Sequence, residues 1–214
     1  MRGVEPPFSA WEADVLPLNY TRRAGHCSGG PWRSRGGRYG AEVAGTTRFR
    51  IDPGRSTLAI DARSSVHPIN AVAAPEGWLE AEVADGAFVP DTAMAGHVEV
   101  AVDDLRTGNR LIDRETRRRI DARRHPTISA DLTRVVAVDG PTATLAGTVA
   151  FLDEAVEVEG TVVIRSAAEG RLILSGQTDL DVRRWGLEPP RLLVLKVEPE
   201  ISVSVQLHLE PADG

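Results

Sequence analysis

The chain contains little cysteine and no long apolar run. Its 214 residues include a single cysteine, Cys27, so no intramolecular disulfide can form, which fits a reducing compartment. No apolar stretch approaches the length of a membrane-spanning helix, and the N-terminus lacks the apolar core of a secretory signal. The sequence therefore predicts a soluble cytoplasmic protein without stable membrane insertion. It would be periplasmic or secreted if the start site is misassigned.

A surplus of basic residues is also missing. The formal net charge is −6, which argues against nucleic-acid binding because phosphate contacts need a basic surface. The G-x-S-x-G, P-loop and G-x-G-x-x-G motifs are absent. No two histidines have the i, i+4 spacing of helical metal ligands, and His97 with Glu99 would need further ligands to hold a metal. We therefore expect no nucleic-acid partner, no metal, no cofactor and no catalytic residues.

The first 46 residues differ from the rest of the chain. Residues 25–40 (GHCSGGPWRSRGGRYG) are rich in Gly, Ser and Arg and show no apolar period. Such a segment cannot bury enough apolar surface to offset the entropy that it loses on ordering. We expect a disordered Gly/Arg-rich tail over residues 1–46, a folded β domain over residues 47–210 and a short C-terminal tail over residues 211–214.

From Thr47 onward, apolar and polar residues alternate. The alternation is clearest in residues 155–165 (AVEVEGTVVIR), 171–182 (RLILSGQTDLDV) and 201–209 (ISVSVQLHL). Successive side chains of a strand point to opposite faces, so this pattern predicts strands with one apolar face. Short breaks with Gly, Pro and Asp separate the segments, which favours antiparallel pairing. We expect an all-β domain of roughly eight antiparallel strands with one short helix.

Amphipathic antiparallel strands bury their apolar faces together in either a sandwich or a closed barrel. The apolar positions here are rich in Val, Ala and Gly, and aromatic residues make up only 5% of the chain. Small inward side chains would leave room inside an eight-stranded barrel for one ligand, although a packed sandwich fits the pattern equally well. The inward candidates for ligand contact are Val156, Val158, Val162, Ile164, Leu172, Leu174, Val203, Val205 and Leu207.

A strongly charged segment, DRETRRRIDARRHP, spans residues 113–126 between predicted strands. It predicts a short helix that Asn109 or Asp113 caps and that ends before Pro126, because a residue that precedes proline disfavours helical geometry. Leu111 and Ile120 are its strong apolar residues, so we expect them to anchor a shallowly docked helix across one end of the barrel.

The arginines of this segment allow two interpretations. Arg114, Arg117 and Arg118 share one helix face and could simply pair with neighbouring carboxylates. Alternatively, they could bind an anionic headgroup such as a diphosphate, because arginine suits bidentate phosphate recognition. His67, which precedes Pro68 in a predicted turn, could add a hydrogen bond to the ligand or serve only the turn.

Three segments resemble the YceI-like family: residues 49–69, 98–132 and 176–205. The middle one is the most specific, with a strand, a Gly-Asn turn, a charged helix, a His-Pro break and the next strand. One departure is Arg55, where the family often has histidine in an Asp-Pro-x-His-Ser pattern. The resemblance implies an antiparallel eight-stranded lipocalin-like barrel that binds a polyisoprenoid or another lipid.

Three classes of function follow from these observations. The first is storage or transport of an amphiphilic isoprenoid or other lipid inside the barrel. The second is a stress-related or interaction protein with a filled barrel, and the third is an enzyme that uses the barrel as its pocket. The absence of a catalytic motif disfavours the enzyme. Exposed strand edges in an incomplete barrel would favour a homodimer.

Overall fold

The computed structural model describes residues 45–65, 67–188, 191–192 and 195–212. Residues 1–44 of the predicted N-terminal tail lie outside these ranges, and so do residues 213–214. The first strand already begins at Gly45. Among the described residues, no helix has both the length and the apolarity that a bilayer-spanning segment needs.

The described residues form mainly strands, as the alternation predicts. The strands are β1 (Gly45–Ile51), β2 (Thr57–Ser64), β3 (Ile69–Ala73), β4 (Glu76–Ala84), β5 (Ala87–Phe88), β6 (Ala93–Ala101), β7 (Thr127–Asp139), β8 (Thr142–Phe151), β9 (Glu154–Ser166), β10 (Leu172–Asp181), β11 (Arg191–Leu192) and β12 (Leu195–Pro211). The helices are α1 (Arg110–Ile120) and the 3-10 turns η1 (Val102–Asp104), η2 (Ala168–Gly170) and η3 (Val182–Trp185).

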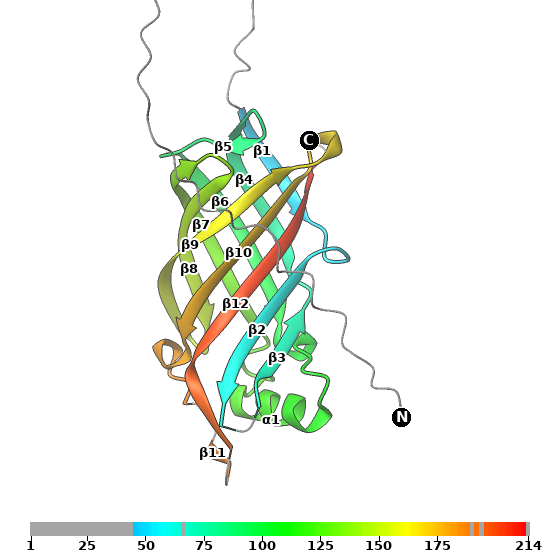
Figure 1. The fold of residues 1–214 in the computed structure, drawn as a ribbon, viewed down its shortest axis with the longest axis vertical. Helices are drawn as coiled ribbons and strands as arrows, with labels where there is room; N and C mark the ends of the chain where they lie inside the picture. Colours follow the sequence, from blue (N-terminus) through cyan, green and yellow to red (C-terminus); the bar gives the residue numbers. More distant parts are fainter. Residues whose placement is uncertain (1–44, 66, 189–190, 193–194, 213–214) are drawn as a thin grey trace, which may run out of the picture. The chain divides into compact units, whose positions relative to one another are not determined.

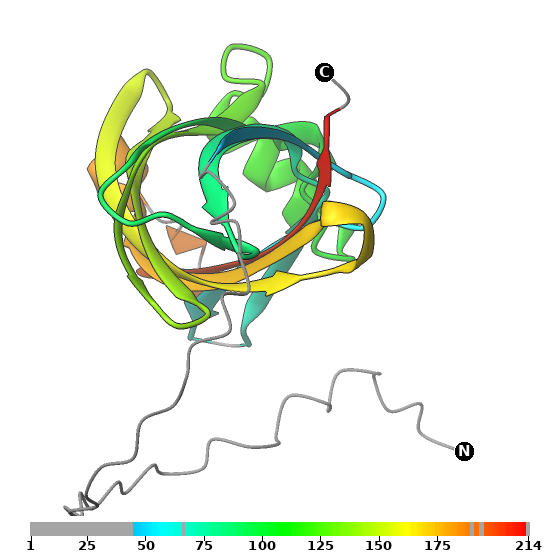
Figure 2. The ribbon, with the colours of Figure 1, turned by 90° about the horizontal axis from the view of Figure 1, so that it is seen from above.

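Eight strands close into an antiparallel barrel, as the ring in Figure 2 shows. Their order is β1-β4-β6-β7-β8-β9-β10-β12, and β12 pairs with β1 to complete the ring. Beyond the end of β1, β2 continues the wall along β12, and β3 pairs with β2 (Figure 1). The closed barrel confirms the predicted architecture, and the sandwich is not the fold.

Strand β12 joins the first and last parts of the barrel. It is 17 residues long and pairs with β10, β2 and β1 in the wall and with the short strand β11 at its start. Its Val203 lies opposite Ile60 of β2, and its Leu209 lies opposite Ile51 of β1. β12 bonds to β10 along one edge and to β1 and β2 along the other, so closure of the ring depends on this single strand.

The two ends of the barrel carry different elements (Figure 1). The β5 end holds β5, η2 and the β7–β8 turn at residues 139–142, and the Ser166 hydroxyl donates to the Gly86 carbonyl there, 3.1 Å away. The α1 end holds α1, η1, η3 and the β8–β9 turn at residues 151–154. Arg124, just after α1, forms an ion pair of 3.4 Å with Asp153 in that turn.

A buried apolar cluster fills the β5 end. Its members come from most strands of the ring and from β5: Phe49, Ile51, Leu79, Ala81, Phe88, Met94, Val135, Ala143, Leu145, Ile164, Leu172, Leu174, Leu207 and Leu209. A smaller cluster of Ala73, Val100 and Leu105 lies where β3, β6 and η1 meet, toward the α1 end. Hydrophobic burial is therefore concentrated at one end of the barrel.

Candidate functional site

The inward residues predicted to contact a ligand separate into two groups. Ile164, Leu172, Leu174 and Leu207 are buried in the cluster at the β5 end, where Leu174 pairs with both Ile164 and Leu207. Val156, Val158, Val162, Val203 and Val205 are only half-buried; Val162 and Val205 still pack against that cluster, and the other three lie farther toward the α1 end. Strand alternation places both groups on the inner face. The apolar surface that remains accessible therefore lies toward the α1 end.

Gly160 belongs to the half-buried part of the inner wall. It lies on the inward side of β9 between Val158 and Val162, opposite Leu145 of β8. A Cβ added at Gly160 would meet no atom within 4 Å, whereas one at Gly147 would lie 2.4 Å from the Asp131 carbonyl oxygen. The inner wall therefore has open space beside Gly160, while Gly147 is required for a close backbone approach.

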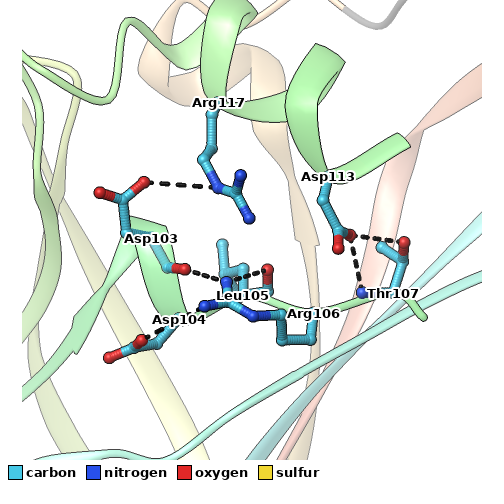
Figure 3. Close-up of polar contacts among 7 residues, drawn as sticks. All are labelled: Asp103, Asp104, Leu105, Arg106, Thr107, Asp113 and Arg117. Carbon is cyan, nitrogen blue, oxygen red and sulfur yellow. Dashed lines mark hydrogen bonds and ion pairs between the residues drawn. The ribbon is translucent and has the colours of Figure 1, made fainter. Parts of the chain in front are cut away.

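Helix α1 begins as the sequence predicts. The Asn109 side chain caps it, because its Oδ1 accepts hydrogen bonds from the amides of Leu111 and Ile112 at 3.0 and 3.4 Å. Asp113 is buried one turn later. Its Oδ1 accepts from the Thr107 amide at 2.9 Å and from the Thr107 hydroxyl at 2.6 Å (Figure 3). These hydrogen bonds hold the pKa of Asp113 below its usual value, so its carboxylate ties α1 to the preceding loop.

A second contact joins α1 to η1. The Nε atom of Arg117 is buried and lies 3.4 Å from Asp103 Oδ1, as an ion pair without hydrogen-bond geometry. Arg106 lies between these elements (Figure 3), where its guanidinium donates to the Leu105 carbonyl at 3.3 Å. Arg117 therefore points from the helix toward the η1 loop.

The other two predicted headgroup residues lie on the exposed side of α1. Arg118 donates to Glu115 through Nε and Nη2 at 2.9 and 2.8 Å, and Arg119 donates to Glu115 at 2.9 Å. The Arg118 hydrogen bonds, and after them the Arg119 bond, lower the pKa of Glu115 to about 2. Arg114 is exposed. Arg117 and Arg118 thus each face a carboxylate, and the three guanidinium groups do not form one cluster.

One anchor predicted for α1 is wrong. Ile120 is buried at 6% exposure, whereas Leu111 is 71% exposed. The reason is local, because the two Thr107 hydrogen bonds place Asp113 on the buried side, and a 3.6-residue period turns Leu111 outward. The sequence signal for this arrangement was a Thr six residues before an Asp, which is too unspecific to use.

His67 lies in the β2–β3 turn and is exposed. Its amide donates to the Ser64 hydroxyl at 3.2 Å, and its Nδ1 lies 3.1 Å from the Pro68 carbonyl oxygen. The described contacts of His67 therefore lie within its own turn.

A histidine–carboxylate cluster occupies the outer wall of the barrel. His97 Nδ1 lies 2.7 Å from Asp131 Oδ1, and His97 Nε2 lies 3.7 Å from Glu99 Oε2. The hydrogen bond to Asp131 raises the pKa of His97. The pairing of β6 with β7 places Asp131 opposite His97, although the two residues are 34 positions apart in the sequence. The sequence did not predict this contact.

The polar groups around Trp185 are hydrogen-bonded within the protein. Arg183 Nε donates to both oxygens of Asp181, at 2.9 and 3.0 Å. Trp185 is buried, and its indole nitrogen donates to the Val149 carbonyl at 3.0 Å. This contact fixes η3 to β8 at the α1 end of the barrel.

Comparison with known proteins identifies a family. A family model described as the YceI-like domain matches residues 49–209. No curated protein matches the chain.

Solved structures of the same fold are similar over most of their length. BcnA of Burkholderia cenocepacia matches with a TM-score of 0.64 and 11% identity, covering 74% of this chain and 98% of its own. A polyisoprenoid binding domain from Saccharophagus degradans, implicated in plant cell wall breakdown, matches with a TM-score of 0.59 and 9% identity, covering 77% and 98%. The YceI protein of Campylobacter jejuni has a TM-score of 0.53 and 11% identity, covering 65% and 82%.

Proposed function

The chain belongs to the YceI-like domain family, and from that premise we propose that its barrel binds an isoprenoid or another amphiphilic lipid, for storage or transport. The Saccharophagus degradans structure, which has this fold, is a polyisoprenoid binding domain. At 9% identity that likeness supports the fold alone, so the argument for a ligand rests on the residues of this chain.

The observation that carries the proposal is the accessible apolar surface on the inner wall. We place the lipid tail among Val156, Val158, Val162, Val203 and Val205, which are inward and half-buried. The buried residues Ile164, Leu172, Leu174 and Leu207 then form the closed floor that limits how deep the tail reaches.

An apolar tail supplies enough free energy for useful affinity. Each buried methylene contributes roughly 0.8 kcal/mol, so a tail of about twenty carbons has a nominal transfer gain of about 16 kcal/mol. Micromolar binding needs about 8 kcal/mol. Association and ordering of the tail consume much of the difference. The length of tail that the inner wall accommodates therefore decides affinity more than any single polar contact.

We propose that a polar or anionic headgroup lies outside, near α1. Arg114, Arg117 and Arg118 are the candidate partners, and His67 in the β2–β3 turn is a further one. Arg114 is exposed, whereas Arg118 would have to exchange Glu115 for the headgroup. A doubly charged diphosphate could compete for these guanidinium groups, because charge-assisted bidentate hydrogen bonds are strong.

Native mass spectrometry of the purified chain, followed by lipid extraction, tests the proposal directly. We expect a co-purified lipid, or a higher Tm when a prenyl alcohol is added, because a ligand that binds only the folded state stabilises it by mass action. If no lipid is found and added prenyl lipids leave Tm unchanged, the proposal is wrong.

A matched pair of ligands tests the headgroup residues. The R114Q/R117Q/R118Q variant should weaken binding of a prenyl diphosphate by about a hundredfold, because the charge-assisted contacts to the headgroup are lost. It should leave binding of the prenyl alcohol with the same tail almost unchanged, as isothermal titration would show. Equal losses for both ligands would exclude the headgroup role.

The buried cluster at the β5 end favours one alternative, a stress-related or interaction protein with a filled barrel. In that case prenyl lipids would not bind, and a pull-down would recover a protein partner or a homodimer. We propose no catalytic role, so a bound lipid should be recovered chemically unchanged.

A further inference from the structure

Positive charge is concentrated in one segment of this acidic chain, α1 and the residues just after it. Residues 110–124 contain seven arginines and three acidic residues, a net charge of +4. The whole chain carries −6, so the remaining residues carry −10. One short segment therefore provides a cationic surface on a protein that is otherwise anionic.

The arginines of α1 lie mainly on the side that faces away from the barrel. The buried residues Asp113 and Ile120 mark the docked side. At about 100° per residue, Leu111, Arg114 and Arg118 fall on the opposite side. We call this surface, with the flanking Arg110 and Arg119, the basic face of α1, and all five residues are exposed. The acidic residue within it is Glu115, which pairs with Arg118 and Arg119.

An exposed leucine lies in the middle of this face. Leu111 is 71% exposed, more than the other two exposed large apolar residues found among the described residues, Val72 and Val163. Val72 lies beside the loop that precedes α1, because its amide donates to the Arg106 carbonyl at 2.9 Å. Arginines are attracted to an anionic bilayer surface, and an exposed leucine among them can bury its side chain between the lipid headgroups. A nucleic-acid surface would use the arginines and would have no use for Leu111.

The basic face lies at the same end of the barrel as the accessible inner surface. We infer that this face docks onto an anionic lipid bilayer, with Leu111 inserted among the headgroups, so that a lipid can pass between the bilayer and the barrel. The transfer role rests on the proposed function, whereas docking itself depends only on the exposed residues of α1. The contact is peripheral and reversible, because a single short helix supplies few apolar groups.

Vesicle co-sedimentation tests docking without any isoprenoid. The full chain should bind vesicles of phosphatidylcholine with phosphatidylglycerol and should show little binding to vesicles of phosphatidylcholine alone. Added salt should weaken binding, because screening shortens the reach of surface charges. Equal binding to both vesicles, or no binding to either, would overturn the inference.

Two variant pairs assign the binding to the basic face. R110Q/R114Q/R118Q should lower the partition coefficient about a hundredfold, because each basic residue near an anionic surface contributes several-fold. The control R55Q/R134Q/R165Q removes the same charge from exposed arginines elsewhere and should have a much smaller effect.

L111Q should lower vesicle binding about tenfold, whereas V163Q, which changes an exposed apolar residue on β9, should not. If each variant behaves like its control, the assignment is wrong.

Two further outcomes separate this inference from its alternatives. L111Q should bind a prenyl alcohol in detergent as the unaltered chain does, so loss of vesicle binding alone identifies docking. Vesicle binding with no prenyl binding would leave docking in place and reject the proposed function. Retardation of a single-stranded RNA that R110Q/R114Q/R118Q abolishes, without any vesicle binding, would assign the face to RNA and overturn the bilayer proposal.

Discussion

At the β5 end of the barrel, Val135 and Ala143 have no accessible surface, whereas Val156 and Val203 toward the α1 end keep part of theirs. Leu174 and Val203 lie on neighbouring strands, β10 and β12, and both face inward. One barrel wall therefore serves two purposes. Large aliphatic residues close one end and contribute most of the stability, while valines and glycine leave surface accessible at the other end.

The largest expected contrast is between truncations at the two ends. Leu174 is 1% exposed, so L174A should lower the free energy of unfolding by about 3 kcal/mol, because it leaves a cavity in a packed cluster. V203A should cost only about 1 kcal/mol, because Val203 is half-buried and smaller. Urea denaturation of the lipid-free chain measures both values.

The same two variants should differ in the opposite sense in lipid binding. V203A should weaken prenyl-alcohol binding, because Val203 belongs to the proposed tail contact. L174A should affect binding less, because Leu174 lies in the floor beneath the tail. If V203A proves as destabilising as L174A, the α1 end is as tightly packed as the β5 end, and the comparison fails.

A smaller effect is expected when the open space beside Gly160 is filled. G160L places a leucine where an added Cβ meets no atom within 4 Å, so the fold should tolerate it. The side chain should displace part of the tail and weaken prenyl-alcohol binding roughly tenfold or more. The control V163L adds bulk on the outer side of the same strand and should leave affinity unchanged. Unaltered affinity in G160L would show that the tail does not reach Gly160.

The smallest expected effect concerns His97 on the outer wall. The Asp131 hydrogen bond raises the pKa of His97 above its ordinary value of about 6.5. A raised pKa in the folded state means that this pair stabilises the fold fully below pH 6.5 and loses its contribution as pH rises through the raised pKa. The loss should be a few tenths of a kcal/mol, because the pair is partly exposed.

Denaturation of the unaltered chain and of H97Q across this pH range measures the difference, which H97Q should remove. His97 lies on the outer wall, so a lipid bound inside the barrel should leave the NMR titration curve of His97 unchanged. A shifted curve would indicate binding on the outer wall instead.

Alternation was sufficient to predict β9, β10 and the second half of β12. In residues 155–165, Val156, Val158, Val162 and Ile164 fall on one parity, and the structure pairs that parity with inward residues of β8 and β10, among them Ala143 and Leu174. Closure of the ring was not readable from any segment, because it depends on β12 meeting both β1 and β2, which are far away in the sequence. The family resemblance supplied that step.

The site was less predictable than the fold. The Asn109 cap followed from local chemistry, but the exposure of Leu111 depended on Thr107 and on the position of Asp113. Parity groups the inward valines in one set, but parity could not show which of them pack tightly. That difference depends on side-chain volume summed around the whole ring, which no single segment contains.

β12 is the last strand along the chain, and it pairs with both β1 and β2. A nascent polypeptide therefore cannot close the barrel until translation has passed residue 211. Until then, β1, β2 and β10 each present an unpaired backbone edge, which is a template for association with other chains. Long sequence separation between the joined partners also slows ring closure. The greatest risk of misassembly thus falls during synthesis, when chaperones that shield bare strand edges would matter most.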